Sequence, residues 1–172
     1  MKTTLFLSVS LDGYIADKRG IPDFPNGAWQ DWCALVNSAD NVIAGRTSYE
    51  QLNGDDMASL LNPTHKIVLS TQDIELTNSG WQLANSPSQA LELLSQAGIE
   101  EAIIGGGRAV ACAFMREGLI DYIVVDLQPS LFGEGISVFG EAIPETQLKL
   151  IESQSLNQNT LRLRYEVLSR KA

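Results

Sequence analysis

The chain has 172 residues, enough to bury a core in one domain, and its 44% hydrophobic and 19% charged residues are typical of a folded globular protein. The formal net charge of −9 argues against a nucleic-acid surface, because phosphate backbones are bound by clustered Lys and Arg. One His and two Cys give no zinc-ligand spacing, so we expect no metal site.

The cysteines and the first residues indicate a cytoplasmic protein. Cys33 and Cys112 both lie in apolar helical patterns, so we expect buried thiols and no disulfide framework. Residues 1–10 contain neither a signal-peptide core nor an apolar span long enough for a membrane. We therefore expect a cytoplasmic protein with no membrane contact.

The chain begins with a predicted strand, a loop and a helix. Residues 3–10 are rich in β formers and end at the turn signal Asp12-Gly13. Residues 12–27 hold three Gly and two Pro, which predicts a long irregular loop of the kind that covers a binding site. A helix is predicted over 28–38. Its apolar face holds Trp29, Trp32, Cys33 and Val36.

Strands and helices continue to alternate up to residue 98. Residues 41–45 predict a strand that gives way at Gly45 to a helix over 46–52. The next predicted strands are 65–70 and 81–84. A helix over 88–97 follows, with Pro in its first turn and Gly98 at its end.

The most informative stretch runs from Glu101 to Glu117. Residues 102–104 predict a strand, and apolar residues at helical spacing predict a helix after Gly105-Gly-Gly107. Glycines at such a junction let backbone approach a ligand, and the first N–H groups of the helix remain free to bind an anion such as phosphate. Alternatively, the glycines make only a tight turn and a close helix–strand contact. The Gly45-Arg46 junction repeats the pattern.

The last third predicts a strand over 119–128, a glycine-rich loop over 129–135 and two strands, 147–155 and 160–169. Alternating strands and helices followed by a hairpin predict a mostly parallel sheet, covered by helices, with an antiparallel edge. Ligands of such sheets bind at the carboxyl ends of the strands, where the glycine and hydroxyl clusters fall.

Five blocks of sequence carry a family resemblance. They are Ser10-Leu-Asp-Gly-Tyr-Ile-Ala16, Ala44-Gly-Arg-Thr-Ser-Tyr-Glu50, Ile67-Val-Leu-Ser-Thr71, Ile103-Ile-Gly-Gly-Gly-Arg108, and Leu119-Ile-Asp121 with Pro129-Ser-Leu-Phe-Gly-Glu-Gly135. In this order they resemble the dihydrofolate reductase superfamily, and more closely the reductase domain of bacterial riboflavin biosynthesis proteins. The resemblance implies one α/β domain over residues 1–172. It would have three α/β/α layers and a mostly parallel sheet of about eight strands that ends in an antiparallel C-terminal hairpin.

The resemblance also implies NADPH as the cofactor. It matches Arg46, Thr47 and Ser48 to a first phosphate-binding turn, and Ser70 and Thr71 to hydroxyls at the adenosine 2′-phosphate. Arginines and hydroxyls near helix N-termini suit a phosphate monoester on chemical grounds as well. The full set of expected cofactor-binding residues is Ser8, Ile15, Gly45, Arg46, Thr47, Ser48, Leu69, Ser70, Thr71, Ile104, Gly106, Gly107, Arg108, Ala109 and Val110.

Asp126 is the candidate catalytic residue, because it interrupts the apolar run of a predicted central strand and by the resemblance faces the substrate. We expect it to bind a nitrogen heterocycle or relay a proton; alternatively it is a carboxylate paired with a neighbouring Arg or backbone N–H. Folate enzymes carry a proton-donating carboxylate on this helix, at the position where Trp29 stands here. Asp31, two residues on, takes that role only if the alignment has a gap of one or two residues; alternatively, it is a first-turn carboxylate that interacts with the helix dipole. The expected substrate-binding residues are Phe6, Trp29, Cys33 and Tyr49.

These features predict an NADPH-dependent reductase that transfers a hydride to a small nitrogen heterocycle of pyrimidine or pterin type. The 5-amino-6-(5-phosphoribosylamino)uracil reductase step of riboflavin biosynthesis is one candidate reaction. The alternative is a catalytically degenerate NADP(H)-binding module of the same fold. A homodimer is expected, as the commonest oligomer.

Overall fold

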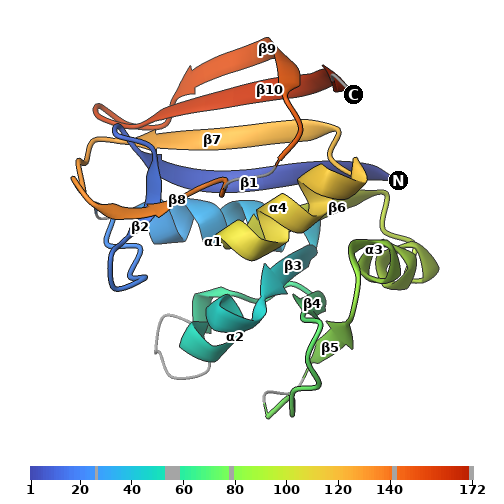
Figure 1. Cartoon of the computed structure of the whole chain (residues 1–172). Helices are drawn as coiled ribbons and strands as arrows, with labels where there is room; N and C mark the ends of the chain where they lie inside the picture. The colour runs from blue at the N-terminus through green and yellow to red at the C-terminus, as the bar shows by residue number, and fades with distance from the viewer. Residues whose placement is uncertain (26, 53–58, 78–79, 141–142, 171–172) are drawn as a thin grey trace.

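The centre of the molecule is an eight-stranded sheet with the strand order β5-β4-β3-β6-β1-β7-β10-β9 (Figure 1). The structure, a computed structural model, describes residues 1–25, 27–52, 59–77, 80–140 and 143–170. The strands of this sheet are β1 (Lys2–Ser10), β3 (Asn41–Gly45), β4 (His65–Leu69), β5 (Trp81–Ala84), β6 (Glu101–Gly106), β7 (Tyr122–Gln128), β9 (Thr146–Ser155) and β10 (Leu161–Arg170).

The sheet is parallel from β5 to β7, and β10 then pairs antiparallel with both β7 and β9. This confirms the predicted mostly parallel sheet with an antiparallel C-terminal hairpin. β1 lies between β6 and β7 and is buried along most of its length, which explains its nearly continuous apolar sequence. The carboxyl ends of the parallel strands meet at one edge, which positions the glycine turns.

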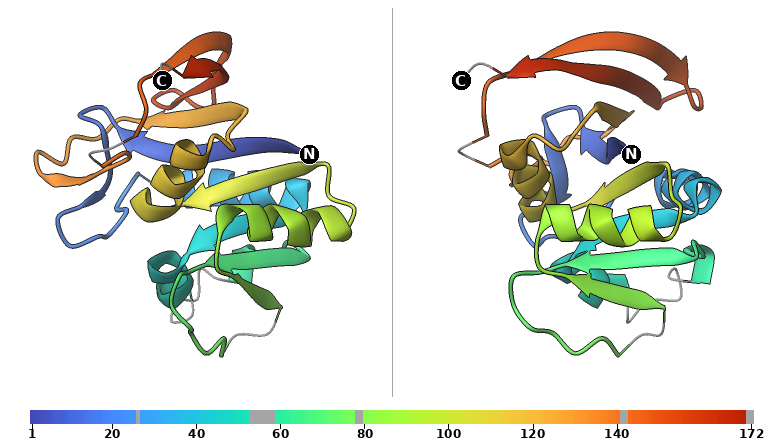
Figure 2. Two further views of the ribbon diagram at one scale, coloured as in Figure 1. Left: turned by 45° about the vertical axis from the view of Figure 1, so that its right-hand side comes forward. Right: turned by 90° about the vertical axis from the view of Figure 1, so that its right-hand side faces the viewer.

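Helices cover both faces of the parallel part of the sheet (Figures 1 and 2). The helix α1 (Ala28–Ala39) buries Cys33 and Val36 on one face, in a cluster with Phe6 of β1. The helices α3 (Pro87–Gln96) and α4 (Arg108–Glu117) cover the other face, where Phe114 is fully buried. The short helix α2 (Arg46–Leu52) directly follows β3, at the carboxyl edge. The four predicted helices are thus present.

One predicted boundary is wrong for a local reason. The strand expected from residue 119 begins at Tyr122. Gly118 ends α4 in the left-handed conformation, with φ 77°, and the Leu119 N–H donates to the carbonyl of Phe114 at 3.0 Å. Leu119 and Ile120 therefore belong to the exit of the helix, and the buried side chain of Ile120 packs in the core beneath it.

The loop predicted over residues 12–27 contains a strand. β2 (Tyr14–Asp17) pairs antiparallel with β8 (Gly135–Ser137) in a separate two-stranded sheet. Asp12 strengthens the link, because its carboxylate accepts from the N–H groups of Phe132, at 3.2 Å, and Gly133, at 2.8 Å. The loop after β1 is thus attached to the loop after β7.

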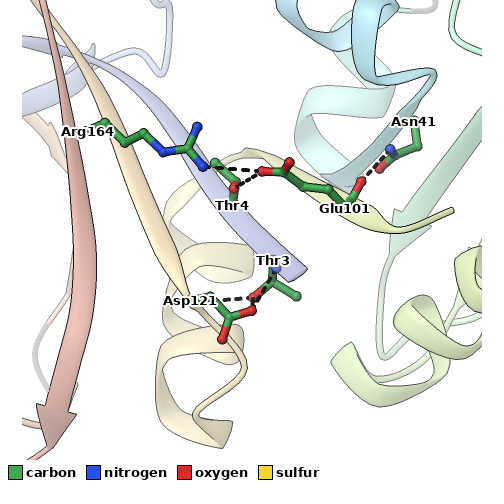
Figure 3. A network of polar contacts seen from close by, with 6 residues as sticks. All are labelled: Thr3, Thr4, Asn41, Glu101, Asp121 and Arg164. Atoms are coloured by element: carbon green, nitrogen blue, oxygen red, sulfur yellow. Dashed lines mark hydrogen bonds and ion pairs between the residues drawn. The ribbon is translucent and has the colours of Figure 1, made fainter. Parts of the chain in front are cut away.

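Side-chain hydrogen bonds join the strands at the edge opposite the glycine turns. Figure 3 shows Thr3, Thr4, Asn41, Glu101, Asp121 and Arg164. The fully buried Asn41 amide donates to the carbonyl of Glu101 at 2.8 Å and accepts from the N–H of Ile103 at 2.9 Å. Backbone pairing of β3 with β6 begins only at Ile43, so the Asn41 side chain supplies the bonds that the ladder lacks there.

Candidate functional site

The glycine turns after β3 and β6 lie side by side, because these strands are neighbours and Ala44 pairs with Gly106. A Cβ placed on Gly45 would lie 3.0 Å from Cγ2 of Val110 and 3.7 Å from the carbonyl oxygen of Gly106. The hydroxyl of Ser48, in α2, lies 3.5 Å from a Cβ placed on Gly106 and 3.7 Å from one on Gly107. The two turns therefore form one continuous surface of backbone and hydroxyl groups.

The N-terminus of α4 provides hydrogen-bond donors on this surface. Gly107 precedes the helix with φ 79° and ψ 146°, a conformation that favours glycine. The first helical hydrogen bond runs from the N–H of Ala111 to the carbonyl of Gly107 at 3.1 Å. The N–H groups of Arg108, Ala109 and Val110 therefore have no acceptor within the helix, which is the arrangement that binds anions.

The three glycines of the turn have different roles. A Cβ on Gly105 would lie 2.6 Å from Cγ2 of Val42 and 2.9 Å from Cζ2 of Trp32, so this glycine lets α1 pack closely on β6. For Gly105, the interpretation as a close helix–strand contact is correct. Gly106 and Gly107 instead lie beside Ser48.

Arg46 contacts the turn that follows β4. The Arg46 Nη1 donates to Oε1 of Gln72 at 3.1 Å, and its Nε lies 3.8 Å from the carboxylate of Glu50. The Ser70 hydroxyl donates to the Gln72 carbonyl at 2.9 Å and accepts from the Gln72 N–H at 3.1 Å. Thr71, which lies between Ser70 and Gln72 in the chain, is exposed, so its hydroxyl is more accessible than that of Ser70.

The side chain of Arg108 is hydrogen-bonded to Ser137 of β8. Its Nε donates to the carbonyl of Ser137 at 3.0 Å and its Nη2 to the hydroxyl of Ser137 at 3.1 Å. The side chain thus joins α4 to β8. Its backbone N–H remains available at the helix N-terminus.

The other residues expected at the cofactor differ in exposure. Thr47 and Ala109 are exposed, and Ser8, Ile15 and Leu69 are partly buried. Ile104 is fully buried and Val110 is 2% exposed, both in the core between the sheet and α4. Side-chain contacts of these two residues with a ligand are excluded, and only their backbone groups remain for one.

Asp126 is paired with an arginine that the sequence did not point to. Asp126 is fully buried, and Arg162 lies opposite it on β10. The Arg162 Nε donates to Oδ1 at 2.6 Å and Nη2 donates to Oδ2 at 2.7 Å. The guanidinium carbon lies 5.2 Å from the centre of the Phe6 ring. The structure thus agrees with the alternative interpretation of Asp126 as a carboxylate paired with a neighbouring Arg.

Asp31, in the first turn of α1, acts on the same guanidinium. The Asp126 hydrogen bonds are the largest cause that raises the Arg162 pKa, and the Asp31 charge raises it further, while burial opposes both. Carboxylates from α1 and β7 therefore lie near one arginine.

Two of the residues expected to bind the substrate, Cys33 and Tyr49, have almost fully buried side chains. Cys33 is 2% exposed, and burial raises the pKa of its thiol to about 11. Tyr49 is 3% exposed and packs edge-on against Trp81, with ring centres 5.4 Å apart. Trp81 is on β5, four strand positions from β1, or ~19 Å at the usual strand spacing. The contact with Trp81 thus holds the Tyr49 ring several strands away from Asp126, whereas Cys33 packs in the same buried cluster as Phe6 and Val124.

Trp29 is partly buried and stacks on Trp32, with ring centres 4.9 Å apart and 21° between the planes. Phe6 is 1% exposed, and the Arg162 guanidinium lies over its ring. Of the four residues expected to bind the substrate, Phe6 thus has a ring contact with Arg162.

The described residues were expected to hold neither a metal site nor a membrane span. They contain no group of three His, Cys, Asp or Glu side chains close enough to hold a metal ion. In the same residues, every helix is too short or too polar to cross a membrane.

The sheet, its two adjoining glycine turns and its C-terminal hairpin define a dihydrofolate-reductase-like α/β fold. The chain belongs to the RibD C-terminal domain family, whose model matches residues 1–161.

Similar proteins agree with this assignment. The uncharacterized protein YwjB of Bacillus subtilis is 27% identical over 162 residues, which cover 91% of this chain and 93% of YwjB. A crystal structure from Shewanella sp. PV-4, provisionally described as a riboflavin biosynthesis protein, has a TM-score of 0.80 at 26% identity, with 98% of this chain and 100% of that chain covered.

A larger protein contains the same fold. The diaminohydroxyphosphoribosylaminopyrimidine deaminase/5-amino-6-(5-phosphoribosylamino)uracil reductase of Thermotoga maritima has a TM-score of 0.70 at 16% identity. The match covers 97% of this chain but 56% of the Thermotoga chain. At this identity, the likeness shows the fold alone.

Proposed function

We propose that the protein is an NADPH-dependent reductase that transfers a hydride to a small nitrogen heterocycle of pyrimidine or pterin type. The observation that carries the proposal is the meeting of the turns after β3 and β6, with Ser48 beside Gly106 and Gly107. Membership in the RibD C-terminal domain family supports a reductase. The description of the Thermotoga relative suggests 5-amino-6-(5-phosphoribosylamino)uracil as a candidate substrate class.

The residues present fit a phosphorylated dinucleotide. A side chain at Gly106 or Gly107 would fill space beside the Ser48 hydroxyl, so glycine keeps this surface open. In the proposal, the N–H groups of Arg108, Ala109 and Val110 bind the pyrophosphate, together with the hydroxyl of Ser48. NADPH supplies the hydride when bound, and the protein binds and orients the reacting groups.

We assign Arg46 and Thr71 to the 2′-phosphate that distinguishes NADPH from NADH. Arg46 already lies beside the turn that follows β4, since it donates to Gln72. The N–H donors of a guanidinium suit a phosphate monoester, and Thr71 adds an exposed hydroxyl. The 2′-phosphate would compete for the Arg46 bond to Gln72.

A catalytically degenerate NADP(H)-binding module is the second candidate. It is favoured by the pairing of Asp126 with Arg162, because a carboxylate that accepts two guanidinium hydrogen bonds is not poised to donate a proton. The two candidates share the cofactor site and differ in turnover.

Thermal denaturation with NADPH, with NADH and with neither tests the cofactor. A ligand that binds the folded state raises Tm by mass action, and we expect a larger rise with NADPH. Arg46→Gln should reduce the preference for NADPH by about 10-fold in Kd, the size of one charge-assisted hydrogen bond. Lys149→Gln, which removes one charge from β9 at the far edge of the sheet, is the matched control. Absence of any rise with NADPH would refute both candidates.

Turnover separates the reductase from the module. NADPH oxidation, followed by absorbance with pterins and aminopyrimidines as substrates, should appear above background for a reductase. NADPH binding without oxidation across both series would favour the module.

We further propose a homodimer in which the apolar strip of the hairpin packs against its copy. The strip consists of Leu148, Leu150, Leu163, Tyr165 and Val167. Cross-strand pairs place these side chains on the face that α3 and α4 cover elsewhere, and Leu148 and Leu150 are 41% and 51% exposed. The opposite face carries the Lys149–Glu166 ion pair.

A second copy is the occupant that suits this surface. The hairpin extends the sheet beyond its helices (Figure 2), so β9 is exposed along its whole length apart from its first residue. The strip continues into a groove of about 240 Å³ that is lined in part by Met115, Ile143 and Leu148. A two-fold axis brings the strip of one copy against the same strip of the other, so the two apolar surfaces match in length and cover each other. The charged face stays in water.

We place the enzyme in the cytoplasm. Cys33 and Cys112 are both buried free thiols, which supports a reducing compartment.

A further inference from the structure

The Asp126–Arg162 pair has hydrogen-bonding capacity that the pair itself does not use. A guanidinium has five N–H donors, and Asp126 takes one from Nε and one from Nη2. The second N–H of Nη2 and both of Nη1 remain, and among the described residues they have no hydrogen-bond partner. The Arg162 side chain is 22% exposed, so part of it is reached from outside, whereas the Asp126 side chain, at 0%, is not.

The orientation of the guanidinium is fixed. The bidentate bond to Asp126 sets its plane, and the Phe6 ring lies beneath it at 5.2 Å. A buried ion pair is a weak source of stability, because the loss of hydration offsets most of the attraction. An oriented, partly exposed cation is instead typical of a binding group.

The surrounding charges select the kind of ligand. Arg162 and Asp126 cancel, and Asp31 adds a negative charge, so the three groups together carry −1. An anionic group therefore gains no net attraction here, whereas a neutral carbonyl oxygen can accept the remaining N–H donors. The buried amide of Gln128, on the same face of β7, has an Nε2 without a partner among the described residues, which further indicates a missing acceptor near this end of the strand.

We propose that Arg162 binds a carbonyl oxygen of a neutral lactam ring in the substrate, with Asp126 as the positioning residue that orients the guanidinium. This inference rests on the proposed function and specifies its substrate class: rings with a carbonyl at the position that faces β10, in preference to rings with an amino group there. Asp126 acts on the substrate through Arg162 and does not touch it.

The test measures binding of two probes to the NADPH complex by calorimetry at pH 8. The probes are 5,6-diaminouracil, which has two ring carbonyls, and 2,4,5,6-tetraaminopyrimidine, in which amino groups replace them. We expect the wild-type protein to bind the uracil at least about 10-fold more tightly, the value of one hydrogen bond to a charged donor.

The main variant changes both members of the pair, because Arg162→Gln alone would bury an unpaired carboxylate. Asp126→Asn with Arg162→Gln should abolish the preference for the uracil and leave the Kd of NADPH within about twofold, since the glycine turns are untouched. Asp126→Asn alone should reduce the preference only partly, because the cation remains but is less well oriented. If this single change abolished it completely, Asp126 would contact the substrate directly and its assignment as a positioning residue would be wrong.

Arg164→Gln is the matched control. Arg164 lies two residues along on the same face of β10, over the Tyr122 ring at 4.7 Å and 3.8 Å from Glu101. It should keep the wild-type preference. A wild-type complex that binds NADPH but does not prefer the uracil, or a double variant that keeps the preference, would overturn the inference and leave the proposed function standing. Failure to bind NADPH would instead count against the proposed function.

Discussion

The indole ring of Trp32 occupies the space that a side chain at Gly105 would need. Its Cζ2 lies 2.9 Å from the position of a Cβ on residue 105, and Cγ2 of Val42 lies 2.6 Å from it. Gly105 therefore sets how closely α1 approaches the sheet. For the next residue, Gly106, the nearest atom in the described part of the chain, its two chain neighbours aside, is the Ser48 hydroxyl oxygen, 3.5 Å from the Cβ position.

Alanine at these two glycines should have opposite effects. Gly105→Ala should lower the free energy of unfolding by about 1–3 kcal/mol, because Trp32 and Val42 must move. Gly106→Ala should change stability by less than about 1 kcal/mol but raise the Kd of NADPH about 10-fold or more, because the methyl group enters the proposed phosphate surface. Urea denaturation and fluorescence titration measure the two effects. Equal NADPH affinity of Gly106→Ala and wild type would contradict the role of this glycine.

The attachment of the loop after β1 should weaken in acid. The Ser10 hydroxyl, which donates to Asp12 at 2.6 Å, and the N–H groups of Gly133 and Phe132 lower the pKa of Asp12 below its ordinary value of 3.8. Because the folded pKa is below the unfolded one, the stabilisation is complete above about pH 5 and is lost as the pH falls through the folded pKa.

Hydrogen exchange of the Gly133 amide measures this effect, after correction for the intrinsic exchange rate. We expect protection to be constant down to about pH 5 and to fall below pH 4. Asp12→Asn should reduce protection at neutral pH and remove its acid dependence. The Lys2 amide, bonded to the Glu100 carbonyl at the other end of β1, is the internal control. A pH-independent Gly133 amide in the wild-type protein would exclude this role for Asp12.

Cys33 should be unreactive in the folded protein. With a pKa of about 11 its thiolate fraction at pH 8 is roughly one in a thousand, and the side chain is 2% exposed. Labelling with a chromogenic disulfide should be slow in buffer and complete in 8 M urea, with Cys33→Ala identifying the site. Rapid native labelling that a substrate analogue slows would restore Cys33 as a substrate-binding residue.

A charge in the apolar strip should break the proposed dimer. Leu150→Lys buries an ammonium group in the contact, and we expect the molar mass from light scattering to halve. Gln147→Lys adds the same charge to the opposite face of β9 and should leave the mass unchanged. A wild-type protein that is monomeric at micromolar concentration would rule out the dimer.

Sequence patterns located features that depend on neighbours along the chain. The β-branched run before Gly105, the Pro and Gly around α3, and Gly45 before α2 each act within a few residues, and these elements appear as predicted. The fold class followed from their alternation. The family resemblance gave the order of the blocks. The structure places Arg46 against the turn after β4, where it donates to Gln72.

The features that were missed depend on pairing between distant residues. Arg162 looked like one polar residue in an alternating strand, and only the register of β10 on β7 sets it against Asp126, 36 residues away. Likewise β2 has no strong pattern of its own and gains its identity from β8. The contact of Tyr49 with Trp81 was not predicted, because helix periodicity tells that a residue is buried but not against which strand it packs.

The central place of β1 in the sheet has a consequence for synthesis of the chain. Residues 2–10 leave the ribosome well before both partner strands, 101–106 and 122–128, which are made about a hundred residues later. At usual elongation rates this takes roughly 5–20 s, during which an apolar segment has no sheet to join. The nascent protein must therefore shelter its first strand, which makes this segment the expected contact of a ribosome-associated chaperone.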